Sequence, residues 1–326
     1  MSLTVLAPPV QAGRGHILCG TSSWADRSLV RDGDFYPRKT MTATERLAYY
    51  ASQLPLAEIT TTYRFPPTAE VARQWVDRTP QGFIFDVRCW SLLTGAPTLF
   101  DSLWEDLQQE VRPEVRHRRR LYASHLSPEA LEECWRRFEH ALSPLAQAQR
   151  LGAVILQYPT WWTPKDETRS ELAQARSRLG AYRVAVEFHN PRWFEGDACE
   201  ETLEWLEGAD LALVCVDGPS AGPRAMPPVV AATSELALAR FTGRREDPED
   251  SWPYPYRYRE AELAEWVPRL NELAASASQV HVVMANCWRG DAVDNARTLT
   301  RLMAQASDAS PPPPRSTSMG VDTTEP

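Results

Sequence analysis

Three acidic side chains stand near the ends of short apolar runs: Glu58, Asp86 and Glu187. Alternate side chains of a strand share one face, so Asp86 is expected beside Arg88, and Glu187 beside His189. Converging carboxylates can act as an acid/base pair, a metal nest or a glycosidase-like pair, depending on their separation. The same acids could instead be neutralised by buried arginines and hold the core together. These three acids are the catalytic candidates.

The motif around Glu187 carries the densest chemistry. The run VAVEF ends at Phe188 and is followed by HNPRWF, which places a carboxylate, an imidazole, an amide and an indole at one strand end. His189 could relay protons or bind a metal, although a single histidine is more often a hydrogen-bonded structural residue. Twelve tryptophans supply flat rings that either stack on sugars or seal the core. The substrate-binding candidates are Trp24, Arg88, His189, Trp193, Arg240 and Asn286, with the two arginines holding an anionic group.

No metal site and no cofactor is assigned. Carboxylates with an imidazole can ligate Mn²⁺ or Zn²⁺, but no spacing in the sequence requires it. The six cysteines form no CxxC pair. Cys287 is interpreted as an inert thiol because no activating partner stands beside it, and Asp217 fits either a strand-end site or a plain turn.

Eight short apolar runs rich in β-branched or aromatic residues recur along the chain. They begin at Ile17, Ala57, Phe83, Ala153, Arg183, Leu211, Leu236 and Val280. Helical patterns with start signals lie between most of them. Eight parallel strands joined by helices close into a barrel whose loops after the strands share one rim. We predict a single-domain α/β fold, a (β/α)₈ TIM-like barrel over residues 16–306, with an open doubly wound sheet as the alternative.

Other segments are expected outside this pattern. Residues 1–15 form an N-terminal extension, and residues 307–326 form a Pro/Ser-rich disordered tail. Residues 92–127 are a long insertion after the third strand that could fold over the rim as a lid. Its basic run, 112–120, fits a solvated face, or the basic cleft of a nuclease-like barrel. The prolines and aromatic residues of the connection 246–258 suit an ordered segment that covers the barrel better than they suit a flexible linker.

The composition of the chain limits the kinds of partner that it is expected to bind. The net charge is -8 and the pI is about 5.4, so no nucleic acid is expected unless a local basic cleft overcomes the repulsion. No apolar run is long enough for a membrane span, and no leader pattern stands at the amino end. We expect a cytoplasmic protein whose ligand is small and polar or anionic.

Several motifs resemble one family in order. They are GTSSW at Gly20, RLAYYASQLPLAEITTTY at Arg46, VAVEFHNPRWF at Val184 and VHVVMANCWRGDAVDNA at Val280. Together they resemble the YecE-like family, domain of unknown function 72, from about Ile17 to Met303. The resemblance implies a TIM barrel with a polar pocket at the strand ends and no established reaction. It retains the motif residues Glu58, Glu187, Asn286, Trp24 and Trp193.

This chain departs from the family pattern around the same rim. The resemblance implies arginine where His189 stands, histidine at Thr242 and Ala96, lysine at Arg88, and asparagine at Ala285. Two functional hypotheses therefore stay open. One is an enzyme that acts on a small polar, phosphorylated or sugar-like substrate by carboxylate acid/base chemistry. The other is a non-catalytic barrel with a degenerate site that binds a ligand or a protein.

Overall fold

The computed structural model describes residues 7–222, 225–246 and 255–309. Eight parallel strands form a closed barrel in the order β2-β11-β10-β9-β8-β7-β4-β3, and the β2–β3 pairing closes it. The strands are β2 Gly15–Thr21, β3 Leu56–Ile59, β4 Ile84–Arg88, β7 Leu151–Gln157, β8 Val184–Glu187, β9 Ala212–Asp217, β10 Leu236–Phe241 and β11 Gln279–Met284. They correspond to the eight predicted runs, so the TIM-like barrel is confirmed and the open sheet is excluded.

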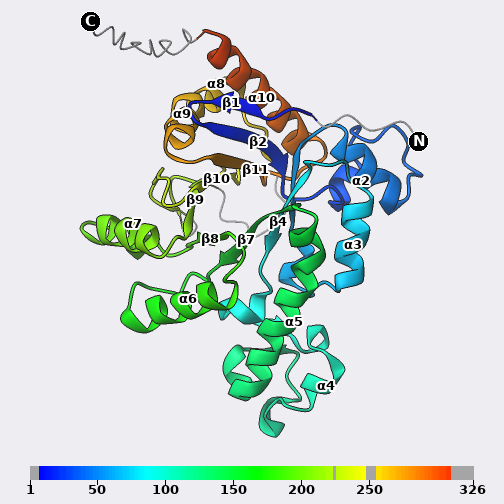
Figure 1. Ribbon diagram of the computed structural model, residues 1–326, viewed down its shortest axis with the longest axis vertical. Coiled ribbons are helices and arrows are strands. Elements are labelled where there is room, and N and C mark those ends of the chain that lie inside the picture. Colours follow the sequence, from blue (N-terminus) through cyan, green and yellow to red (C-terminus); the bar gives the residue numbers. More distant parts are fainter. Residues whose placement is uncertain (1–6, 223–224, 247–254, 310–326) are drawn as a thin grey trace, which may run out of the picture.

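Helices surround the strands (Figure 1). They are α1 Arg27–Arg31, α2 Ala43–Ala51, α3 Ala69–Asp77, α4 Glu105–Gln108, α5 Pro128–Gln147, α6 Asp166–Arg178, α7 Ala198–Gly208, α8 Glu260–Ala264, α9 Trp266–Ser276 and α10 Asp291–Ala309. Side-chain caps start several of them: Thr42 forms a capping box with Glu45, Thr68 caps α3, and Ser127 caps α5. These caps satisfy amide groups that the first helical turn leaves unpaired.

Alternation along the strands separates two apolar layers. On β10, Leu236 and Leu238 point into the barrel with Arg240, and on β8 Ala185 points inward with Glu187. The residues between them pack outward against the helices in the larger core cluster. The barrel therefore carries an apolar plug with polar side chains above it, at the carboxyl ends of the strands.

The seam between β2 and β3 is short. Only Gly20 and Thr21 of β2 pair with β3. The hydroxyl of Tyr50, on α2, extends this seam because it accepts from Thr21 N and donates to Leu56 O, each at 2.9 Å. A Cβ on Gly20 would lie 2.0 Å from Leu56 O, so the close approach of the two backbones requires glycine.

The structure adds detail at the two ends of the chain. Strand β1, Val10–Ala12, lies within the predicted N-terminal extension and pairs antiparallel with β2. Helix α10 continues to Ala309, beyond the predicted start of the tail at 307. The rest of that tail, residues 310–326, lies outside the described residues, as do residues 247–254 of the expected cover. Within the described residues, no helix is both long and apolar enough to cross a bilayer.

The part of the insertion around α4 lies beyond α5, away from the barrel strands (Figure 1). The insertion contains the antiparallel pair β5 Thr98–Leu99 and β6 Arg120–Leu121 and the short helices η2 Ser91–Thr94, η3 Phe100–Ser102, α4, η4 Pro113–Val115 and η5 Ala123–His125. Arg137 of α5 holds it through an ion pair with Asp106 and a stacking contact over Trp104. No residue of 92–127 lines the rim cavity described below, so this structure gives no support to the alternative in which the insertion covers the rim.

We predict that Gly20→Ala will lower the free energy of unfolding by about 3 kcal/mol or more, because the new methyl group must displace backbone at the seam. Gly208→Ala is the matched control. Gly208 ends α7 with open space around it, so the same change there is expected to be neutral or stabilising by up to about 1 kcal/mol. Urea unfolding measures both, and equal stability of the two variants would contradict the seam assignment.

Candidate functional site

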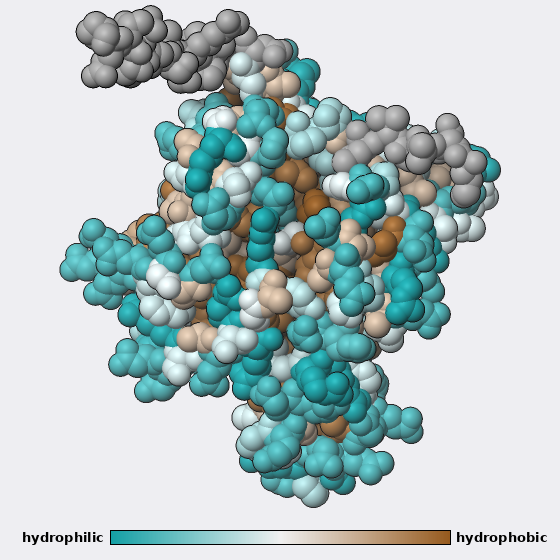
Figure 2. Space-filling model, in the orientation of Figure 1, coloured by the Kyte–Doolittle hydropathy of each residue, from teal (hydrophilic) through white to brown (hydrophobic). Residues whose placement is uncertain are grey.

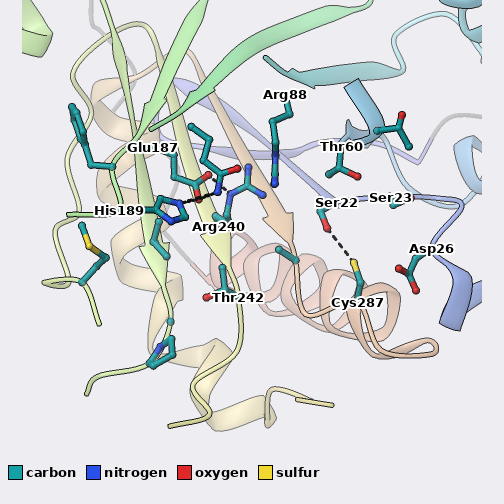
Figure 3. Close-up of a pocket in the computed structure, with 18 of the residues that line it drawn as sticks. Ser22, Ser23, Asp26, Thr60, Arg88, Glu187, His189, Arg240, Thr242 and Cys287 are labelled. Atoms are coloured by element: carbon teal, nitrogen blue, oxygen red, sulfur yellow. Dashed lines mark hydrogen bonds and ion pairs between the residues drawn. The ribbon is translucent and has the colours of Figure 1, made fainter. Parts of the chain in front are cut away.

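A cavity of about 620 Å³ opens at the carboxyl ends of the strands. This is the rim at which TIM barrels place their sites, and the volume suits a small organic ligand. In Figure 3, Arg88, Thr60, Ser22 and Ser23 lie on one side of it, and Glu187, His189, Arg240 and Thr242 lie on the other. The cavity therefore combines a hydroxyl-rich wall with a charged wall.

Arg240 is the centre of the charged wall and is almost fully buried, with 2% of its side chain exposed. Its Nη1 lies 2.7 Å from Glu58 Oε2, and its Nε lies 2.7 Å from Glu187 Oε2. None of its three nitrogens meets hydrogen-bond geometry with a described residue, so charge attraction holds the group more than directed bonding does. The two carboxylates balance the cost of burying the guanidinium and keep its pKa above the ordinary value, although burial alone would lower it.

Glu58 joins Arg240 to Arg88. Its Oε1 accepts from Nε of Arg88 at 2.8 Å and lies 2.8 Å from Nη2 of the same side chain. Both oxygens of Glu58 are thus occupied by guanidinium groups, and the carboxylate is completely buried. Nη1 of Arg88 makes no ion pair or hydrogen bond with the described residues, and Arg88 lines the cavity. Glu58 therefore positions Arg88, whose remaining donor is available to a ligand.

Glu187 is ionised in this setting. Burial acts to raise the pKa of this carboxyl, but the charge of Arg240, the hydrogen bond from His189 and the charge of Arg88 together hold it well below the ordinary value. A carboxyl with a depressed pKa cannot supply a proton at neutral pH, and it is a weak base. The geometry thus favours an orienting and charge-balancing role for Glu187 over direct acid/base work.

His189 stands between this network and the cavity. Its Nε2 lies 2.7 Å from Glu187 Oε1 and 2.9 Å from Nε2 of Gln157, and 37% of its side chain is exposed. When Nε2 donates its proton to Glu187, it cannot also accept from the amide of Gln157, and Nδ1, which makes no hydrogen bond with the described residues, is the remaining acceptor. Figure 3 shows the imidazole beside Glu187 at the cavity. The Glu187–His189 pair is therefore arranged to exchange a proton with a bound molecule.

Asp86 lies below the cavity and does not line it. Both of its oxygens contact Nδ1 of His281, at 2.9 and 3.0 Å, and both side chains are fully buried. Gly152 makes room for the pair, because a Cβ there would lie 2.4 Å from Asp86 Oδ1. The catalytic role predicted for Asp86 is not supported by this placement, since its charge is enclosed in the barrel interior.

Three of the predicted binding residues also lie away from the cavity lining. Trp24 packs edge-on against Trp75 and Phe85. Trp193 is buried, stacks on Phe188 and donates from Nε1 to a backbone carbonyl. Asn286 donates to Tyr256 O and to Asn295 Oδ1, which fastens the chain around Tyr256 to α10. The two tryptophans pack around the barrel and Asn286 is a tether, whereas Arg88, His189 and Arg240 do line the cavity.

Asp217 and Cys287 have structural partners. The carboxylate of Asp217 accepts from Arg244, from the hydroxyl of Tyr258 at 2.8 Å and from Nε1 of Trp266 at 2.6 Å. Cys287 lines the cavity, but burial raises the pKa of its thiol to about 12 despite a hydrogen bond to Ser22. The interpretation of Cys287 as an inert thiol agrees with this environment.

Sequence reasoning missed part of the lining. Ser22 and Ser23 follow β2 inside the GTSSW motif, Thr60 and Thr61 follow β3, and Gln157 ends β7. A polar residue directly after an apolar run was the available signal, the same signal that identified Glu187. Among the described residues, no three His, Cys, Asp or Glu side chains gather as a set of metal ligands.

Comparison with known proteins agrees with this architecture. Residues 18–318 match the family described as "Protein of unknown function DUF72". The chain belongs to the DUF72 family. Its similarity extends to the UPF0759 protein YunF of Bacillus subtilis (strain 168), which is 28% identical over 297 residues, covering 88% of this chain and 94% of YunF.

Two solved DUF72 structures are similar to this chain. The protein from Enterococcus faecalis V583 has a TM-score of 0.70 at 23% identity, covering 88% of this chain and 95% of its own. The protein from Thermotoga maritima MSB8 has a TM-score of 0.66 at 24% identity, covering 90% and 99%. At these identities the two DUF72 structures bear on the fold alone. The family description names no activity.

We predict that Glu187→Gln will lower the free energy of unfolding at pH 7 by about 3 kcal/mol, because it leaves Arg240 partly uncompensated. The folded pKa of Glu187 lies below the unfolded value, so its stabilising contribution is present above roughly pH 4.3 and is lost as pH falls through the folded pKa. The deficit of the variant should therefore be steady near neutral pH and shrink in acid.

Urea unfolding at several pH values measures this effect. Glu260→Gln is the control, because Glu260 pairs with Arg301 on the surface and its loss is expected to cost less than about 1 kcal/mol. A deficit that widens on acidification would mean that Glu187 carries a proton in the folded protein, contrary to this account.

Proposed function

We propose that the rim cavity is the active site of an enzyme that transfers a proton to or from a small polar, anionic substrate. His189 is the proton-exchanging group, and Glu187 holds its ring. The observation that carries the proposal is the 2.7 Å hydrogen bond between His189 and a buried, ionised carboxylate, at the edge of a cavity that the imidazole itself lines. A carboxylate that fixes one ring nitrogen leaves the other directed to a ligand.

The side chains that line the cavity fit a substrate that carries both a negative charge and hydroxyl groups. Arg88 offers a free Nη1, and guanidinium groups suit carboxylate and phosphate oxygens. Ser22, Ser23, Thr60 and Thr61 add hydroxyls that pair with a polyol. The volume of about 620 Å³ accommodates a sugar acid or a sugar phosphate. A phosphorylated or sugar-like substrate therefore fits the cavity.

The roles of the two glutamates differ from a carboxylate acid/base pair. Glu58 is buried with both oxygens on arginines, and Glu187 is ionised. Their contribution is to orient Arg88 and His189 and to balance Arg240. We therefore assign the proton transfer to the imidazole of His189, because an imidazole exchanges protons readily near neutral pH.

The test begins with a thermal-shift screen of sugar acids and sugar phosphates, because a ligand that binds the folded state raises the melting temperature. Turnover of each hit is then followed by NMR. We expect His189→Gln to lower kcat by about 100-fold or more while Kd changes less than about threefold. Arg88→Gln should weaken binding by about tenfold or more.

The rival function is a binding barrel without catalysis. The departures from the family pattern at His189 and Thr242 favour it, since they change groups that line the cavity. Hits that stabilise the protein without any turnover, in wild type as in His189→Gln, would support that rival and overturn the enzyme. Hits whose affinity is unaffected by Arg88→Gln would overturn the assignment of the anion to Arg88.

A further inference from the structure

The insertion carries a basic surface that the rim cavity does not use. We define the basic surface as the five arginines of residues 112–120: Arg112, Arg116, Arg118, Arg119 and Arg120. All five are exposed, and the same stretch holds a single acid, Glu114. Figure 2 shows that the part of the molecule around α4 is largely hydrophilic, and Figure 1 shows that it projects beyond α5.

These arginines differ from those on the neighbouring helices. Arg136, Arg137 and Arg178 each form an ion pair with a glutamate or an aspartate. None of the five arginines of the basic surface forms an ion pair with a described residue. Their charge is therefore not neutralised within the described chain and is available to a partner.

The backbone of the basic surface is well held. Arg112 donates to Ser124 O, and Arg116 donates to Val111 O and Gln109 O, so two guanidinium groups fasten the loop. Arg120 lies in β6, paired with Leu99 of β5. Arg118, Arg119 and Arg120 make no side-chain hydrogen bond with a described residue, so their donors are free on a supported backbone. Less conformational entropy is then lost when they bind.

The charges also gather in space. Burial lowers the pKa of His125, the charges of Arg118 and Arg112 lower it further, and the charge of Glu114 acts the other way, so two guanidinium groups and one carboxylate act on the same imidazole. The overall charge of -8 does not cancel this local field. At physiological salt, charges separated by more than about 8 Å of solvent are largely screened from one another.

We propose that this basic surface binds single-stranded nucleic acid through its phosphates. Arginine forks match phosphate oxygens in bidentate fashion, and consecutive arginines can follow a flexible backbone. Tyr122 stands two residues after Arg120 and is 40% exposed, which supplies a ring on which a base can stack. An acidic protein segment would use the charges but not the ring. The sequence-based expectation of no nucleic acid rested on net charge alone.

Fluorescence anisotropy with a labelled 20-nucleotide RNA, and the same sequence as DNA, tests this proposal on the full chain. Binding is expected to weaken roughly 20-fold between 50 and 200 mM salt if about three phosphates are contacted. Arg118→Ser, Arg119→Ser and Arg120→Ser together should weaken it by about tenfold or more, and Tyr122→Ala by about fivefold or more.

The control replaces three exposed arginines elsewhere, Arg31, Arg73 and Arg183, by serine, which changes the net charge equally. It should retain wild-type affinity. If both triple variants lost affinity for the oligonucleotide equally, binding would depend on the overall charge of the protein and not on the basic surface, and the proposal would fail. It would also fail if no oligonucleotide bound at 50 mM salt, or if a glutamate-rich peptide bound as tightly as the RNA.

Discussion

One buried cation organises the rim of this barrel. Arg240 lies inside the closed sheet with almost no access to water, and an unpaired charge there would cost several kcal/mol. Glu58 and Glu187 approach it from β3 and β8 and supply the compensating charge. Each carboxylate then directs a second group: Glu58 holds Arg88, and Glu187 holds His189. The cation thus sets the arrangement of the side chains that face the cavity.

That arrangement needs a closed barrel, because β3, β8 and β10 are not adjacent in the sheet, and only a ring turns their inward side chains toward one another. Closure depends on the narrow seam where Gly20 meets Leu56 and where the hydroxyl of Tyr50 bridges the two strands. The apolar plug of Leu238, Ala185 and their neighbours excludes water below the ion pairs. Lower effective dielectric strengthens the attraction between Arg240 and its carboxylates. Fold and electrostatics therefore support each other at this rim.

The sequence predicted the barrel well, since strand periodicity and cap residues are local signals that survive in the folded chain. It also singled out Arg88, Glu187, His189 and Arg240, which line the cavity, because each stands at or near the end of an apolar run. It could not separate layers along the barrel axis, which depend on strand stagger; Asp86 therefore looked equivalent to Glu187 but pairs with His281 inside. The ring orientation of Trp24 and the path of the insertion are tertiary outcomes that no local pattern encodes.

This organisation of the rim requires that Arg240 and Glu187 depend on one another energetically. A double-mutant cycle with Arg240→Met, Glu187→Gln and the combined variant, followed by urea unfolding at pH 7, measures that dependence directly. We expect a coupling free energy of about 2 kcal/mol or more, with the double variant less destabilised than the sum of the two single variants. Single effects that add to within about 0.5 kcal/mol would show that the two groups are merely adjacent, and would contradict this organisation of the rim.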